Sequence, residues 1–296
     1  MVKKRWQSFL SLTLLTAVLL GGAPCAWSAE GERPTTELTL SVLSAYICNG
    51  DELSRHSAVI QPQIAVGYKG FNLLVWGNLD TRPYLAEQAN YRGDRRQNWT
   101  ETDVKIGYNK TFGIFKAGLT YAYYGNAAFW NSDTSGVGPD QKDDQELVLT
   151  AGLETFLAPT LTVARSFDST QRWYLTLGLS HSVELTKRVS IALAATGSYL
   201  VSEDDNRRRI NEDGTDRKAD GSWNDRYNDF HDATVSLSLP VKILDSLTVT
   251  PQVSYIFPLN NNAKYDMMFR SMQADTTFRD RQSSFLVGGV SFTYRY

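Results

Sequence analysis

Residues 99–124 read WTETDVKIGYNKTFGIFKAGLTYAYY, and the charges at the start of this stretch occupy alternate positions. Glu101, Asp103 and Lys105 lie on one side of that alternation. The residues on the other side are Thr102, Val104, Ile106 and Tyr108. Alternation with period two is typical of a β-strand whose two faces meet different surroundings. The stretch therefore predicts a strand with one polar face and one apolar face.

The same alternation recurs along the chain, and helical spacing is nowhere sustained. It predicts twelve strands, at residues 36–47, 57–69, 71–80, 99–109, 113–124, 145–157, 160–168, 171–184, 188–201, 231–241, 247–258 and 284–296. Most of these segments reach about 10 residues, the length that a tilted strand needs to cross a bilayer.

The connections between these strands alternate between short and long. The short ones are Lys69-Gly70, Asn109 to Phe112, Ala158-Pro159, Thr186 to Arg188 and Lys242 to Ser246; the long ones include 81–98, 125–144, 202–230 and 259–283. A transmembrane up-and-down barrel has this asymmetry, with tight periplasmic turns, long outer loops and an even number of strands. We therefore predict an all-β fold, a single antiparallel barrel of about 12 strands with both termini in the periplasm.

A charge turned toward the lipid midplane costs about 2–4 kcal/mol, whereas a wet lumen accepts it. We therefore expect the charged face of each strand to point inward. The pore-lining residues predicted on this basis are Glu101, Asp103, Lys105, Lys116, Glu146 and Glu154. Barrels of eight strands are filled by side chains and much larger ones are wide channels, so this strand number predicts a narrow lumen. Both signs of charge occur, so charge alone does not predict selectivity.

The chain begins with the basic stretch MVKKR, continues with an apolar run over residues 9–20 and then has small residues. This is the pattern of a secretory signal peptide, here cleaved after Ser28 or Ala29. The expected organisation is a signal peptide over 1–29 and an outer-membrane barrel over 30–296.

The net charge of −2 and the isoelectric point near 6.0 give no basic field of the kind that nucleic-acid binding needs, so no nucleic-acid partner is expected. The chain has 2 cysteines, and cleavage of the signal peptide removes Cys25. Cys48 is then alone, which excludes an internal disulfide.

Aromatic residues near strand ends predict the girdles that mark the two membrane interfaces. They are Tyr46, Tyr68, Phe71, Trp99, Tyr108, Tyr199, Tyr255 and Phe257. The final strand, SSFLVGGVSFTYRY, ends on an aromatic residue, with Leu286, Gly288, Val290, Phe292, Tyr294 and Tyr296 on one face. This resembles the C-terminal signature of bacterial outer-membrane proteins, which implies the barrel-assembly machinery as a partner during biogenesis.

The stretch LSAYICNGDELSRHSAVIQPQIAVGYKGFNLLVWGNLD resembles the N-terminal pattern of the TorF-type family of outer-membrane porins. The matching residues are Ser44, Tyr46, Gly50, Gln61, Pro62, Gly70, Phe71, Trp76 and Gly77. Cys48-Asn49 departs from that pattern, where an aromatic residue followed by arginine is expected. The resemblance covers the first part of the processed chain. It implies an outer-membrane barrel with a transport role and supplies no catalytic residues.

Outer-membrane barrels also include enzymes, and each of the three histidines of this chain is a candidate catalytic base. His56 falls in the first outer loop, His181 is expected on the lipid side, and His231 is expected at the outer rim as a solvated residue. His231-Asp232 is the best enzymatic candidate of the three, but we assign no catalytic residue.

The loop over 206–229 is rich in carboxylates, namely Glu212, Asp213, Asp216, Asp220, Asp225 and Asp229. Such oxygen-rich loops can hold Ca²⁺, but arginines interleave here and the spacing is not that of an EF-hand. We expect a solvated loop that can contact lipopolysaccharide, and we assign no metal and no cofactor.

The sequence as a whole predicts a protein of the bacterial outer membrane, in contact with its lipid and lipopolysaccharide. The leading functional hypothesis is a narrow porin-like channel for small hydrophilic solutes. Two alternatives stay open: an enzyme that modifies lipid or lipopolysaccharide, and a structural or adhesive barrel that acts through its long outer loops.

Overall fold

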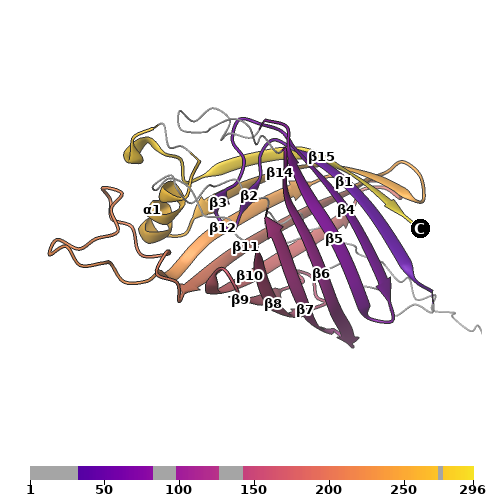
Figure 1. The fold of residues 1–296 in the computed structure, drawn as a ribbon. Coiled ribbons are helices and arrows are strands. Elements are labelled where there is room, and N and C mark those ends of the chain that lie inside the picture. Colours follow the sequence, from indigo (N-terminus) through magenta and orange to yellow (C-terminus); the bar gives the residue numbers. More distant parts are fainter. Residues whose placement is uncertain (1–32, 83–97, 127–142, 273–275) are drawn as a thin grey trace, which may run out of the picture.

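The computed structural model describes residues 33–82, 98–126, 143–272 and 276–296, so the predicted signal peptide lies outside the described residues. Long strands wind in chain order into a closed antiparallel sheet (Figure 1). They are β1 (Thr35–Leu43), β4 (Val59–Tyr68), β5 (Phe71–Asp80), β6 (Trp99–Phe112), β7 (Phe115–Asn126), β8 (Asp144–Leu153), β9 (Thr160–Phe167), β10 (Gln171–Glu184), β11 (Ser190–Ser202), β12 (Asn228–Ser238), β14 (Leu247–Pro258) and β15 (Phe285–Arg295).

The barrel closes because β1 pairs with both β4 and β15, while β14 pairs with both β15 and β12. The two-residue strand β13 (Val241–Lys242) pairs with Thr248 and Val249 at the start of β14. It is too short to count as a strand of the barrel wall. Closure gives every long strand two hydrogen-bonded neighbours, which is what a sheet needs in lipid. The predicted 12-stranded antiparallel barrel is confirmed.

The two ends of the barrel differ as the loop lengths predicted. One end, here called the short-turn end, carries the tight connections and the strand ends nearest the two termini. The other, the long-loop end, carries residues 44–58, 203–227 and the segment after β14. The long-loop end of such a barrel faces the outside of the cell. The turn predicted at Asn109 to Phe112 is wrong, because β6 continues to Phe112 and the chain turns at Gly113 with φ 63°.

The two faces of each strand separate apolar from polar side chains. On β6 the outward Ile106 is 55% exposed, whereas Glu101, Asp103 and Lys105 are buried on the inner face. Exposed aromatic residues near strand ends, among them Phe71 and Tyr255, lie on the outer face. An apolar outer surface on a closed barrel is the pattern of a protein of the bacterial outer membrane. None of the described helices is long and apolar enough to cross a membrane.

Residues 44–58 do not continue β1 but fold back into the barrel, which is why the strand predicted to reach residue 47 ends at Leu43. They contain a small hairpin of β2 (Ile47–Cys48) and β3 (Asp51–Glu52). Tyr46 is wrong as a girdle residue, because it is buried and packs on Trp76 with ring centroids 5.5 Å apart. Tyr46 and Ile47 belong to one apolar cluster with the inner faces of four strands, through Leu43, Val59, Ile256, Phe285 and Val287.

A short helix, α1 (Asn261–Phe269), follows β14 inside a segment predicted to be loop, and a 3-10 turn, η2 (Phe278–Asp280), precedes β15. The side chain of Asn260 caps α1 by accepting a hydrogen bond from the Ala263 amide. Met267 of α1 packs into the same apolar cluster as Tyr46. The hairpin and the helix therefore lie together at the long-loop end, beside the labels β2, β3 and α1 in Figure 1.

Candidate functional site in the lumen

An irregularity in β12 brings two polar side chains into the barrel side by side. The register between β11 and β12 shifts between Gly197, which pairs with Ala233, and Tyr199, which pairs with Phe230. Two residues of β12, His231 and Asp232, therefore lie opposite Ser198 alone. Such a bulge rotates the strand and redirects a side chain. Both His231 and Asp232 are buried, although strict alternation would place them on opposite faces.

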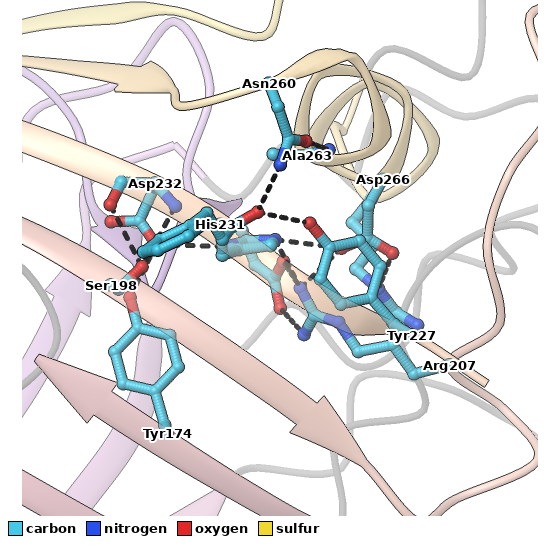
Figure 2. A network of polar contacts seen from close by, with 12 residues as sticks. Tyr174, Ser198, Arg207, Tyr227, His231, Asp232, Asn260, Ala263 and Asp266 are labelled. Carbon is cyan, nitrogen blue, oxygen red and sulfur yellow. Dashed lines mark hydrogen bonds and ion pairs between the residues drawn. The ribbon is translucent and has the colours of Figure 1, made fainter.

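His231 lies between two carboxylates (Figure 2). Its Nδ1 is 2.9 Å from an oxygen of Asp232, and its Nε2 is 3.1 Å from an oxygen of Asp266 on α1. Nη2 of Arg207 lies 3.1 Å from the same Nε2, so the imidazole contacts a guanidinium as well as the two carboxylates. The ring of Tyr227 meets the imidazole edge-on with centroids 5.3 Å apart. His231 is 0% exposed, so the expectation of a solvated rim histidine is wrong.

Arg207 ties three segments of the chain together, as Figure 2 shows in part. It comes from the loop between β11 and β12, and its guanidinium donates to Asp51 of β3 at 3.1 Å through both terminal nitrogens. The same group donates to Asp266 of α1 at 2.6 Å. A planar guanidinium suits such multiple pairing with carboxylates. One side chain thus joins the hairpin, the helix and a third loop.

The Asp232 side of the network continues along the barrel wall. Tyr174 of β10 donates its hydroxyl to Asp232, and the Ser198 hydroxyl of β11 donates to the same carboxylate oxygen at 2.9 Å. The backbone amide of Asp232 in turn donates to the Ser198 hydroxyl at 2.9 Å. Side chains of two neighbouring strands, β10 and β11, therefore hold Asp232 in place, and Asp232 contacts His231.

Asp266 and Arg207 lie outside the barrel strands, and the charges around them shift their pKa values. Burial alone raises the pKa of Asp266, but the guanidinium groups of Arg207 and Arg270 and the hydrogen bond from His231 outweigh it. The pKa of Asp266 is therefore held well below its usual range. Burial lowers the pKa of Arg207, but Asp266 and Asp51 outweigh it and raise that pKa above its ordinary value. Both groups are ionised at neutral pH, and each needs the other, because a buried charge without a partner is costly.

A second charged layer lies on the inner wall next to the hairpin. Glu101 of β6 hydrogen-bonds with the Tyr46 hydroxyl, and Lys105 forms an ion pair with Asp103 at 3.3 Å. On the neighbouring wall Glu146 accepts from the hydroxyls of Tyr124 and Ser166 and lies 3.7 Å from Arg172. Four of the six predicted pore-lining residues, Glu101, Asp103, Lys105 and Glu146, thus face inward and are buried. Their role in a conducting path is a proposal.

The other two predicted pore-lining residues lie near the short-turn end. Lys116 forms an ion pair with Glu154 at 2.7 Å. The predicted strand over 145–157 ends earlier, at Leu153, so Glu154 belongs to the turn after β8 and its side chain is 49% exposed. The six residues therefore form two separate groups along the barrel axis.

Between these groups the inner wall carries a row of threonines. Thr150 of β8 pairs with Thr162 of β9, which pairs with Thr176 of β10. All three point inward, and all are partly exposed rather than buried. Thr176 pairs in turn with Ser198 of β11. The wall nearer the short-turn end is thus hydroxyl-rich and accessible, whereas the charged side chains of the wall at the hairpin are buried.

The remaining histidines and the acidic loop take other positions. His56 is exposed in the first loop, and His181 faces outward as predicted, with Nδ1 2.8 Å from the Phe156 carbonyl oxygen. The loop after β11 folds as an extended hairpin with bridges Arg208 to Arg226 and Arg217 to Trp223. Several of its carboxylates bind groups of the same loop, for instance Asp205 with both Arg208 and Arg226. The described ranges contain no group of three or more His, Cys, Asp or Glu side chains arranged to hold a metal ion.

Sequence reasoning missed Arg207, Asp51 and Asp266 as a unit. They lie far apart in the chain, and nothing in the local pattern marks Arg207 apart from its neighbours Arg208 and Arg209. A β-bulge leaves no reliable trace in the alternation either. The one available signal was the adjacency of His231 and Asp232 at a strand end.

No protein-family model matches the sequence, and no curated protein matches it. The resemblance to the TorF-type family therefore stays a prediction. Among solved structures, the fold is similar to that of the NanC porin, with a TM-score of 0.50 and 8% identity over 88% of this chain and 98% of that one.

Two further solved structures are more distant. The COG4313 outer membrane channel from Pseudomonas putida F1 has a TM-score of 0.45 at 10% identity, over 92% of this chain and 99% of that one. A mutant of the TodX monoaromatic hydrocarbon channel has a TM-score of 0.40 at 12% identity, over 93% and 95%. At these identities the similarity concerns the barrel fold alone.

Proposed function

We propose that the protein is a narrow, porin-like channel of the outer membrane that passes small hydrophilic solutes. The observation that carries this proposal is the row of Thr150, Thr162 and Thr176, inward-facing and accessible in a barrel of twelve strands. Hydroxyl side chains exchange hydrogen bonds with water and with polar solutes, which an apolar wall cannot do. The rim-enzyme alternative loses its support, because its best candidate base, His231, is fully buried.

The neighbouring charged layer adds to this proposal. Glu101, Lys105 and Glu146 are buried on the inner wall beyond the threonine row, so charges of both signs line that part of the barrel interior. Charged side chains of this kind set which ions and solutes pass a pore. Lipid and lipopolysaccharide around the barrel, and recognition of the exposed C-terminal Tyr296 during assembly, belong to the same proposal.

Single-channel recording of the purified protein in planar bilayers tests the channel. We expect discrete current steps, and their reproducible absence would reject the proposal. A matched pair of variants tests whether the current passes through the lumen. Thr162→Trp fills space inside the barrel, whereas Leu161→Trp replaces an outward side chain that is 45% exposed. Smaller steps for Thr162→Trp, with unchanged steps for Leu161→Trp, are the expected result.

A further inference from the structure

The hairpin β2–β3 and helix α1 form one body inside the long-loop end. Gly50, at the tip of the hairpin, has φ +80°, and a Cβ there would lie 2.8 Å from the His231 ring and 3.3 Å from Met267 of α1. The amide of Met272, just after α1, donates to Glu52 of the hairpin at 2.9 Å. We call residues 44–58 together with α1 the plug.

The plug occupies the path that the proposed channel would use. Tyr46 packs on Trp76 of β5, and Gly50 lies against the His231 ring of β12. Strands that lie on different sides of the lumen are thus bridged by the plug. The inward side chains of Glu101, Asp103 and Glu146, on the wall at this level, are buried.

Two kinds of contact hold the plug. The apolar cluster of Tyr46, Ile47 and Met267 is non-directional and can re-form after a small displacement. The polar contacts are specific, and they converge on Arg207, which binds the hairpin through Asp51 and the helix through Asp266. Arg207 itself belongs to neither part of the plug, since it comes from the loop after β11.

We propose that the plug is the gate of the channel and that Arg207 is its latch, so that conduction requires Arg207 to release Asp51 and Asp266. This inference rests on the proposed channel function and names its regulation. With the latch closed, the threonine row forms a vestibule that is open only toward the short-turn end.

The processed protein offers a reporter that does not depend on conduction, because Cys48 lies on β2 within the plug. The rate at which a small, membrane-impermeant thiol reagent labels Cys48 measures plug displacement. We expect Arg207→Gln to raise this rate at least about tenfold, the change that about 1.4 kcal/mol of lost coupling produces. The same variant should spend more time in the open state in planar bilayers.

Arg208→Gln is the matched control. Arg208 is the next residue, but its guanidinium binds Asp205 and the Asn224 carbonyl within its own loop, so labelling should stay at the wild-type rate. Heat-dependent gel mobility shows whether each variant is folded. If Arg207→Gln does not fold, Asp51→Asn carries the test, since it frees only the hairpin and leaves the pair of Arg207 and Asp266.

The outcomes separate the two proposals. Folded Arg207→Gln that labels at the wild-type rate overturns the latch, and so does labelling that rises equally in Arg208→Gln. Wild-type and Arg207→Gln channels with the same open time also overturn the latch while the channel function stands. Faster labelling without current in any variant supports a latched plug and overturns the channel.

Discussion

Asp266 is the residue on which the cations of the network converge. Its carboxylate receives Arg207 at 2.6 Å, the His231 ring at 3.1 Å and Arg270 at 3.4 Å, and its side chain has no exposed surface. Asp51 accepts hydrogen bonds from both terminal nitrogens of the same Arg207 guanidinium. Removing one partner of a buried ion pair costs about 3–5 kcal/mol, because the other charge stays buried and uncompensated. Asp266 therefore contributes to stability mainly as the counter-charge of these cations.

The lowered pKa of Asp266 makes this contribution depend on pH. Because the folded pKa lies below the value of about 3.9 for an unfolded aspartate, the stabilisation is complete above that pH. It is lost as the pH falls through the folded pKa. We expect Asp266→Asn to lower the unfolding midpoint by an amount that is constant from neutral pH to about pH 5 and shrinks below about pH 4. Thermal unfolding in lipid vesicles measures the difference in midpoint between the wild type and Asp266→Asn, with the exposed Asp245→Asn as control. A difference that is as large at pH 3 as at neutral pH would contradict the stabilising role of the ionised Asp266.

The hairpin β2–β3 is the element that local pattern could not predict. The pattern predicted a strand up to residue 47 and an ordinary outer loop over 48–56. Residues 44–58 instead turn inward, because Tyr46 and Ile47 pack against Ile256 and Phe285 from the other end of the chain. Helix α1 was missed for a similar reason, since it is short and its sequence carries little amphipathic pattern. Long-range packing decides both elements.

A substitution at Gly50 tests how closely the hairpin packs against His231. Its φ of +80° disfavours any L side chain, and an added Cβ would also collide with the His231 ring at 2.8 Å. Gly221 has φ +83° with nothing within 4 Å, so it shares the backbone cost without the collision. We expect Gly221→Ala to cost about 1–2 kcal/mol of unfolding free energy and Gly50→Ala about 1–3 kcal/mol more. Urea unfolding in vesicles compares the unfolding free energies of the two variants. An equal loss in Gly50→Ala and Gly221→Ala would mean that the hairpin does not pack closely against His231.

At the scale of the whole molecule, alternation predicted the barrel well but did not predict the hairpin and helix that fold inside its long-loop end. The strands at 71–80, 171–184 and 247–258 were predicted with the bounds that the structure shows. Lipid fixes which face points outward, so a local pattern is enough there. The interior is different, because the bulge at His231 and the contacts of Arg207 depend on which loops meet inside the closed cylinder. The charged side chains were predicted to face inward, but their burial under the plug was not.

Arginine substitutions at two neighbouring positions on β8 test which face of the strand meets lipid and which meets water. Leu149 is 55% exposed on the outer face, and Thr150 points into the lumen beside Thr162. An arginine at position 149 would face hydrocarbon, so we expect Leu149→Arg to cost about 2–4 kcal/mol of unfolding free energy. Thr150→Arg places the same group in the wet vestibule, where it should leave the folded barrel stable and change the size or ion preference of the current steps. Denaturant titration in vesicles with parallel bilayer recording makes the comparison; similar losses at both positions would mean that the two faces do not meet lipid and water as assigned.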